Sequence, residues 1–462
     1  MSLLKVTNLS VSTADTGLLE PISFSLDVGE RLCILGQTGS GKSLLAQAIM
    51  GNLPDGLSSG GELALFGAKA TRASRRKLWG RRLSMLPQEP WNALNPLMSA
   101  RNQLAETYHR VRGDEAEAAR QSADYTLALQ GLSSSGHKRV DQLSGGMAQR
   151  VAIACAMAGG APLLLADEPT KGLDVNRRDQ VVQQLIAQAE NGALLCITHD
   201  VAVARQIGGR VMVVKEGKLV ESGLSDTVLN APSHPYTREL IAADPASWPE
   251  RNAESSPGGA ILLETEALTI GRGSQMLANN LSLRIRRGEV LGVVGDSGCG
   301  KSTLGDTLLC LEKPHTGRLK RHVSTAPHRW QKLYQDPTAA VSHAATLGTL
   351  LEDLVKRHKI ERRRIAPLMA RLGLASTLLE RRAESVSGGE LQRFCLLRAL
   401  LLDPVFLFAD EPTSRLDPIT AQSVSQLLVE IARETDCAVM LVSHDPHLIA
   451  KRCDRVIQLG GR

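Results

Sequence analysis

The sequence predicts an α/β protein that consists of two similar domains in tandem, each with a mainly parallel sheet covered by helices. Three observations support this prediction. The chain has 462 residues, whereas a single domain usually has about 100–200. Its chemically distinctive segments occur twice and in the same order. Within each copy, short apolar runs alternate with helical patterns, which is typical of a parallel sheet with crossover helices.

The composition excludes several classes of protein. Hydrophobic residues make up 43% and charged residues 22%, an ordinary balance for a globular chain. The formal net charge is only +6, without the concentrated basic stripe that nucleic-acid-binding proteins usually carry. Aromatic residues make up 3%, so we do not expect a stacking platform for single-stranded nucleic acid.

Membrane-spanning and secreted classes are also not expected. No apolar run approaches the roughly 18–20 residues that cross a bilayer, and the first ten residues lack the pattern of a signal peptide. The eight cysteines are scattered, with no Cys-x-x-Cys pair, which favours reduced thiols in the cytoplasm. We therefore expect a cytoplasmic protein that contacts a membrane only through partners.

Four repeated segments define the domain organisation. The pairs are Gly36–Ser43 with Gly295–Ser302, Leu143–Met147 with Val386–Glu390, Ala166–Thr170 with Ala409–Thr413, and Thr198–Asp200 with Ser443–Asp445. Proline, serine, glycine and charged residues dominate the stretch near 246–260, which is typical of a linker. The sequence therefore predicts a first domain over 1–245, a linker over 246–260 and a second domain over 261–462.

The elements of the first domain follow from local patterns. Arg31–Leu35 is a short apolar strand that leads into a glycine-rich turn, and Lys42–Met50 has the composition of a helix. Buried strands are predicted over Pro162–Leu165 and Ala193–Ile197. The stretch between them, Arg177–Glu190, is polar and rich in Gln and Ala, as a surface helix would be.

Each glycine-rich turn matches Gly-x-x-x-x-Gly-Lys-Ser between a strand and a helix, which is a phosphate-binding pattern. Glycines let the backbone wrap a phosphate, and the helix N-terminus favours an anion. Lys42 and Lys301 would neutralise the β- and γ-phosphates, and Ser43 and Ser302 would ligate Mg²⁺. The loops comprise Gly36, Gln37, Thr38, Gly39, Ser40, Gly41, Lys42 and Ser43, and Gly295, Asp296, Ser297, Gly298, Cys299, Gly300, Lys301 and Ser302.

Two carboxylates follow an apolar strand in each copy, Asp167-Glu168 and Asp410-Glu411. Acidic residues at the end of one strand are common, but here each pair recurs in the same context. The aspartate would hold Mg²⁺, through water, and the glutamate beside it could polarise an attacking water molecule.

A histidine and a glutamine complete the set of candidate site residues in each copy. His199 and His444 follow apolar strands beyond the carboxylates. An isolated histidine there is more often structural, but this spacing favours a sensor of the γ-phosphate. Gln88 and Gln335 follow short apolar runs and could reach both Mg²⁺ or water and a neighbouring segment.

In this order, the phosphate loop, glutamine, Ser-Gly-Gly signature, Asp-Glu pair and histidine resemble the ATP-binding cassette (ABC) ATPases. The resemblance implies two ABC-type domains, each with a RecA-like core, a helical subdomain and an antiparallel β subdomain. It also implies a head-to-tail sandwich in which each loop faces the signature of the other half. The first site would then face Ser387, Gly388 and Gly389, and the second would face Ser144, Gly145 and Gly146. With no catalytic residue missing, both sites are expected to hydrolyse ATP.

Three segments narrow the resemblance to the ATPase subunits of bacterial oligopeptide, dipeptide and nickel importers. They are residues 88–96, 143–150 and 233–240, and the role of the last is open. The resemblance implies two integral-membrane permeases, an extracytoplasmic binding protein and a place on the cytoplasmic face of the inner membrane. Peptides are the first expected substrates, and nickel or other metal–chelate complexes come next.

The sequence leaves one alternative open, and one of its several departures from the family bears on ATP binding. The alternative is a soluble twin-cassette ATPase that acts on ribosomes or DNA, although the chain lacks the long charged linkers and cysteine-rich modules typical of such proteins. The departure concerns the first strand of each copy, which usually offers an aromatic ring to adenine. Neither Leu9–Gly17 nor Leu268–Ser274 contains one.

Overall fold

The computed structural model describes residues 2–88, 93–171, 173, 175–250, 259–273, 275–296 and 298–460. The chain divides into two compact units, Met1–Asp244 and Pro245–Arg462. The second unit therefore begins within a residue of the predicted end of the first domain. The start of the predicted linker packs on that unit, because the Trp248 ring is buried in its core and Arg452 lies over the ring at 4.0 Å. Residues 251–258 of the linker lie outside the described part.

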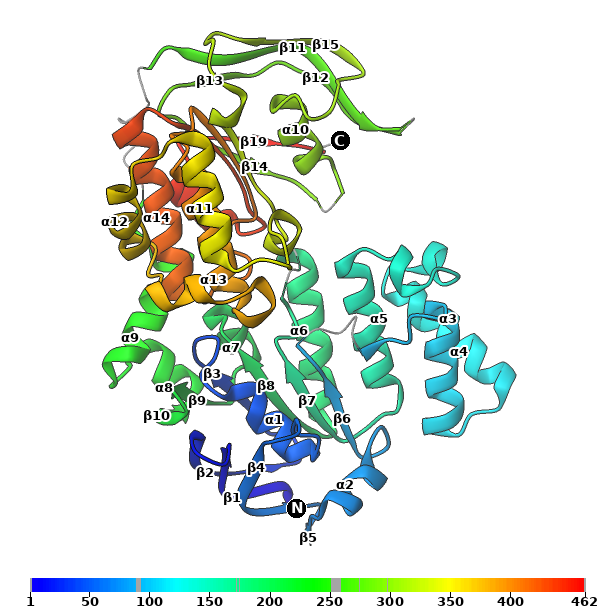
Figure 1. The fold of residues 1–462 in the computed structure, drawn as a ribbon. Helices are drawn as coiled ribbons and strands as arrows, with labels where there is room; N and C mark the ends of the chain where they lie inside the picture. The colour runs from blue at the N-terminus through cyan, green and yellow to red at the C-terminus, as the bar shows by residue number, and fades with distance from the viewer. Residues whose placement is uncertain are drawn as a thin grey trace. The chain divides into compact units, whose positions relative to one another are not determined.

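The first unit is built on a six-stranded sheet in the order β10-β9-β3-β8-β7-β6 (Figure 1). Neighbouring strands are parallel except for the antiparallel pair β9–β10. The strands are Arg31–Leu35 (β3), Leu83–Leu86 (β6), Leu163–Asp167 (β7), Ala193–Thr198 (β8), Arg210–Lys215 (β9) and Lys218–Leu224 (β10). The central strands are buried along almost their full length, as expected for a sheet covered on both faces.

A second, antiparallel sheet lies beside the phosphate-loop helix of this unit. Its order is β2-β1-β4-β5, with strands Ser2–Ser12 (β1), Gly17–Asp27 (β2), Ser58–Leu65 (β4) and Ala68–Lys69 (β5). Helix α1 (Lys42–Met50) buries Leu45 and Ile49 in one apolar cluster with Leu4 of β1 and Leu165 of β7. The helix that follows the loop is thus held by both sheets.

The other helices of the first unit include a separate helical group. Helices α3, α4 and α5 pack on one another to the side of the parallel sheet (Figure 1). The helices are Arg72–Leu78 (α2), Ala100–Thr107 (α3), Ala116–Leu129 (α4), Gly145–Ala158 (α5), Val175–Glu190 (α6), Val201–Ile207 (α7), Ser225–Asn230 (α8) and Pro235–Ala242 (α9).

The second unit repeats this topology. Its parallel sheet has the order β16-β17-β18-β14-β19, which matches β6-β7-β8-β3-β9 strand for strand. The strands are Val290–Val294 (β14), Trp330–Leu333 (β16), Phe406–Asp410 (β17), Ala438–Val442 (β18) and Arg455–Gln458 (β19). The antiparallel sheet comprises Ile261–Arg272 (β11), Gln275–Leu281 (β12), Arg284–Arg286 (β13) and Thr316–Arg321 (β15).

The described helices of the second unit follow the order of α1 and α3–α7 in the first. They are Lys301–Leu308 (α10), Leu347–His358 (α11), Ile365–Arg371 (α12), Gly388–Leu400 (α13), Pro418–Thr435 (α14) and Pro446–Arg452 (α15). Helix α10 lies between the antiparallel and the parallel sheet (Figure 1), and buries Leu304 and Leu308 there. The predicted α/β fold with two tandem domains is confirmed.

The predicted element boundaries differ from the structure by at most two residues, and helix α6 begins at Val175 instead of the predicted Arg177. Strand β3 and helix α1 begin and end where predicted. Strand β7 continues to Asp167 because that residue still pairs with Ile197 of β8, so the first carboxylate lies on the strand itself. None of the described helices is both long and apolar enough to cross a bilayer.

Candidate functional site

The first glycine-rich loop joins β3 to α1 in a path that glycine alone permits. A Cβ atom at Gly36 would lie 2.1 Å from the carbonyl oxygen of Val214. Gly41, the N-cap of α1, has a φ of 89°, in the left-handed region that favours glycine. Gly295 shows the same constraint in the second unit, where its Cβ would lie 2.4 Å from the Leu459 carbonyl oxygen. Both loops are therefore built from the same backbone geometry.

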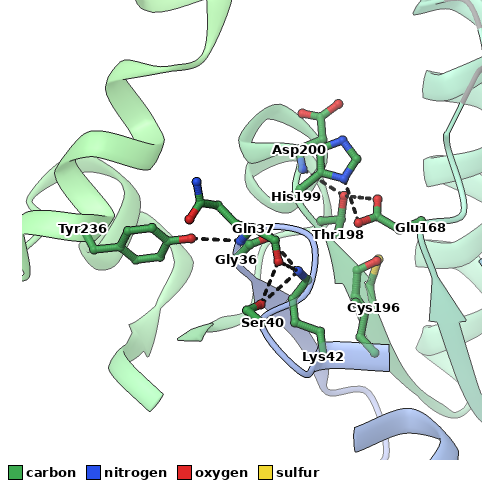
Figure 2. Close-up of polar contacts among 11 residues, drawn as sticks. Gly36, Gln37, Ser40, Lys42, Glu168, Cys196, Thr198, His199, Asp200 and Tyr236 are labelled. Carbon is green, nitrogen blue, oxygen red and sulfur yellow. Dashed lines mark hydrogen bonds and ion pairs between the residues drawn. The ribbon is translucent and has the colours of Figure 1, made fainter. Parts of the chain in front are cut away.

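Each loop lysine folds back over its own loop. The Lys42 ammonium group donates hydrogen bonds to the carbonyl oxygens of Gly36 and Gln37, both at 2.6 Å, and to the Ser40 hydroxyl at 3.2 Å (Figure 2). In the second unit, Lys301 Nζ donates to the carbonyl oxygen of Gly295 at 2.7 Å. The cation thus lies at the mouth of the loop, where it can meet the phosphates of a nucleotide.

The two glutamates share an unusual backbone conformation. Glu168 has a φ of 50° and Glu411 a φ of 52°, a region that residues other than glycine rarely adopt. The Glu168 amide donates to the carbonyl oxygen of Ile197 at 2.8 Å, and the Glu411 amide donates to Val442 at 3.1 Å. Such strain persists only where surrounding structure fixes it, and it clusters at functional sites. Its recurrence at both positions supports the predicted roles of these glutamates.

In the first unit, the glutamate is paired with the histidine that follows β8. His199 Nδ1 lies 2.7 Å from Glu168 Oε1 (Figure 2). Burial alone would raise the pKa of Glu168, but the facing His199 outweighs it, and this pKa lies below its ordinary value. Burial lowers the pKa of His199, yet the glutamate raises it further, so the net shift is upward. The pair therefore favours an ionised carboxylate and a protonated imidazole.

The second unit holds the corresponding pair more loosely. His444 Nε2 lies 3.5 Å from Glu411 Oε1, and this buried oxygen has no hydrogen-bond partner among the described residues. Burial, with the charge of Asp410 beside it, raises the pKa of Glu411 to about 8. The two glutamates thus have the same backbone conformation but pKa values shifted in opposite directions.

The residues at the end of β7 fit a magnesium ion. Asp167 Oδ1 is buried without a hydrogen-bond partner in the described part of the chain. Burial raises the pKa of Asp167 to about 6, while a hydrogen bond from the Ser43 hydroxyl opposes that shift. Ser302 stands in the same relation to Asp410. Mg²⁺ prefers such oxygen ligands and usually completes its shell with water and phosphate oxygens.

A cavity of about 330 Å³ shows which predicted residues the second unit brings together. It is lined by Gly298, Gly300, Lys301, Ser302, Gln335, Asp410, Glu411 and His444. It is also lined by Arg272, Gln275 and Leu277 at the turn between β11 and β12, which the sequence analysis did not select. An alignment of the two repeats could have indicated these residues, because the β1–β2 turn and the β11–β12 turn lie at similar distances before Lys42 and Lys301.

The signature residues of the second unit do not line this cavity. Ser144 is the N-cap of α5 and accepts a hydrogen bond from the Met147 amide, and Ser387 caps α13 in the same way through Glu390. Both serines are exposed. Gln88 is half-buried just after β6. Of the predicted site, Ser297 lies outside the described residues, as do residues 89–92 that follow Gln88.

One protein-family model matches the sequence of both halves of the chain. The model of the ABC transporter family matches residues 19–171 and 278–414, which include both loops and both Asp-Glu pairs. The chain belongs to the ABC transporter family. The predicted resemblance is confirmed, and the ABC domains identify the chain as an ATP-binding, ATP-hydrolysing protein.

Full-length relatives of this ABC protein share its tandem organisation. The ABC transporter ATP-binding protein YejF of Escherichia coli (strain K12) is 33% identical, over 99% of this chain and 94% of its own length. The peptidoglycan transport ATP-binding protein YejF of Agrobacterium fabrum is 31% identical, over 97% and 89%. The glutathione import ATP-binding protein GsiA of Salmonella paratyphi A is 31% identical, over 94% and 80%.

Solved structures support the ABC fold. RNase-L Inhibitor superposes with a TM-score of 0.69 over 98% of this chain and 88% of its own, at 22% identity. A chain in a model of ribosome-bound archaeal Pelota and ABCE1 gives 0.71, over 98% and 76%, also at 22% identity. At this identity the likeness shows the fold alone.

The raised pKa of Glu411 predicts how the stability of this ABC protein depends on pH. Between about 4.5 and 8, the folded state keeps a proton that the unfolded state releases, so the free energy of unfolding falls as the pH rises. Glu411→Gln removes this contribution. Thermal unfolding of the nucleotide- and metal-free chain from pH 5 to 9 should therefore show a flatter profile for the variant. Parallel profiles for the two proteins would contradict the raised pKa.

Proposed function

We propose that the chain is the energy-coupling ATPase subunit of a bacterial ABC importer for peptides. The observation that carries this proposal is that both halves hold the same set of predicted site residues, in a chain that matches a relative over nearly its full length. Two of these relatives are named for glutathione import and peptidoglycan transport. Glutathione is a tripeptide and peptidoglycan carries peptide stems, so small peptides are the shared substrate class. Neither relative is named for nickel.

We infer that each ATP site combines the loop of one half with the signature of the other. The exposed serines Ser144 and Ser387 support this arrangement, since each caps a helix of 14 or 13 residues whose N-terminus favours an anion. The second unit's signature does not line that unit's own cavity. The first site would face Ser387, Gly388 and Gly389, and the second would face Ser144, Gly145 and Gly146.

Within each site, the described side chains divide the chemistry between them. Lys42 and Lys301 bind the phosphates, and Glu168 and Glu411 accept a proton from the attacking water. His199 and His444 orient these carboxylates and contact the γ-phosphate. The residues that would hold Mg²⁺ are Ser43, Gln88 and Asp167 in the first site and Ser302, Gln335 and Asp410 in the second. When bound there, Mg²⁺ would offset the negative charge of the nucleotide phosphates.

The partners of this ATPase would be two integral-membrane permeases and an extracytoplasmic substrate-binding protein. The segments after Gln88 and Gln335 would contact short helices of the permeases and pass closure and reopening of the two units to them. The chain would thus sit peripherally on the cytoplasmic face of the inner membrane.

Cell fractionation tests this proposal. We expect the chain in the soluble fraction when it is expressed alone and in the membrane fraction when the permease genes are co-expressed, because no described helix can span a bilayer. Co-expression of permeases from an unrelated ABC importer is the control and should leave the chain soluble. Equal distribution with and without the cognate permeases would refute the proposal, and so would sedimentation with ribosomes.

A further inference from the structure

We propose that Tyr236 is a positioning residue for the first phosphate loop. Its side-chain hydroxyl accepts a hydrogen bond from the backbone amide of Gln37 at 2.9 Å, although the two residues are 199 positions apart (Figure 2). Tyr236 is only 3% exposed, so its ring cannot swing away without disturbing the core. The inference rests on ATP binding at the first loop and on no particular substrate or partner.

Hydrogen bonds within the segment around Tyr236 fix the position of its hydroxyl beside the loop. His234 caps helix α9, and its Nδ1 accepts a hydrogen bond from the Tyr236 amide at 3.1 Å. The Glu221 carboxylate on β10 accepts hydrogen bonds from the amides of Ser233 at 2.7 Å and His234 at 3.1 Å. Leu240, one turn further along α9, is fully buried. These contacts give the segment 233–240 a structural purpose that its sequence does not reveal.

A second contact holds the loop at Ser40. In the turn between β9 and β10, the Gly217 amide donates to the carbonyl oxygen of Ser40 at 3.2 Å. The Ser40 hydroxyl in turn donates to the carbonyl oxygen of Gln37 at 2.8 Å. Lys215, at the end of β9, places its ammonium group 5.1 Å from the centre of the Tyr236 ring. Tyr236 and the β9–β10 turn therefore fix the loop at Gln37 and at Ser40, respectively.

Loss of these loop contacts should weaken ATP binding more than it slows ATP hydrolysis. A loop that is already ordered loses less conformational freedom when it closes on a nucleotide, so it binds more tightly. Tyr236 is hydrogen-bonded to the Gln37 amide and does not contact Glu168 or His199. The loss of its hydroxyl should therefore leave Glu168, the proton acceptor, in place. In the described part of the second unit, no hydroxyl is hydrogen-bonded to the amide of Asp296, the counterpart of Gln37. We therefore expect the effect only at the first site.

The test uses the full-length chain with Lys301→Ala, which weakens nucleotide binding at the second site. Tyr236→Phe keeps the ring and removes the hydroxyl. We expect the dissociation constant for a non-hydrolysable ATP analogue, measured by calorimetry, to rise by about three- to tenfold. When Tyr236→Phe is made in a chain that keeps Lys301, the KM for ATP should rise while kcat changes by less than about twofold.

Tyr108→Phe is the matched control, because Tyr108 is also buried and its hydroxyl bonds to Thr126 at 2.7 Å, away from the loop. The control should lose similar thermal stability and bind the analogue as before. Unchanged affinity in a folded Tyr236→Phe chain would overturn the proposal, and so would an equal loss in Tyr108→Phe. If the Lys301→Ala parent binds no nucleotide, the failure lies with the first site itself and not with Tyr236.

Discussion

Replacing Glu168 or Glu411 by glutamine should slow ATP hydrolysis at the altered site by about 10²–10⁴-fold and leave ATP binding intact. Each glutamate is held at the end of a buried strand in a strained conformation, with 6% and 5% of its surface exposed. A carboxylate can accept the proton of an attacking water molecule, whereas a carboxamide of the same shape cannot, and losses of this size are typical of a missing general base.

The measurement is the steady-state rate for each single variant, with bound ATP counted in the double variant. Glu289→Gln is the control, because Glu289 is equally buried in the second unit but pairs with Arg455 at 2.9 Å. The double variant should retain two ATP molecules per chain, and this number should not depend on protein concentration because both units belong to one chain. Near-normal turnover in either single variant would show that its site does not hydrolyse ATP.

The core of each site could be predicted from the sequence because its residues are fixed by local spacing. The glycines and lysine of a loop lie within eight residues of one another, so strand, turn and helix impose their geometry directly. The Asp-Glu pairs and histidines follow neighbouring strands of a parallel sheet, whose carboxyl ends meet at one edge. The recurrence of each motif in the second half then supported each assignment twice.

Contacts that join distant segments could not be predicted in this way. Nothing near Tyr236 in the sequence indicates that its hydroxyl meets Gln37, because only the folded path of β10, α8 and α9 brings them together. Arg272 lines the cavity of the second unit at the end of β11, and its charge alone does not distinguish it from an ordinary surface residue. Trp248 packs in a core although its neighbours have the composition of a linker.

Stimulation of ATP hydrolysis by a transport complex is the second large effect that we expect. Two ATP sites that close and reopen with substrate delivery should turn over slowly in the isolated chain and faster when a permease favours closure. Coupling between sites commonly amounts to a factor of 5–150, so we expect stimulation of about tenfold. A chain with Glu168→Gln and Glu411→Gln should show none, because its hydrolytic sites are disabled.

The most direct test compares two activators of the same purified chain. ATP hydrolysis is measured in proteoliposomes that contain the cognate permeases, with binding protein and peptide supplied on the opposite side, and separately with ribosomes in solution. The importer assignment predicts stimulation only in the proteoliposomes, and only when both binding protein and peptide are present. Stimulation by ribosomes with no response to the permeases would contradict it.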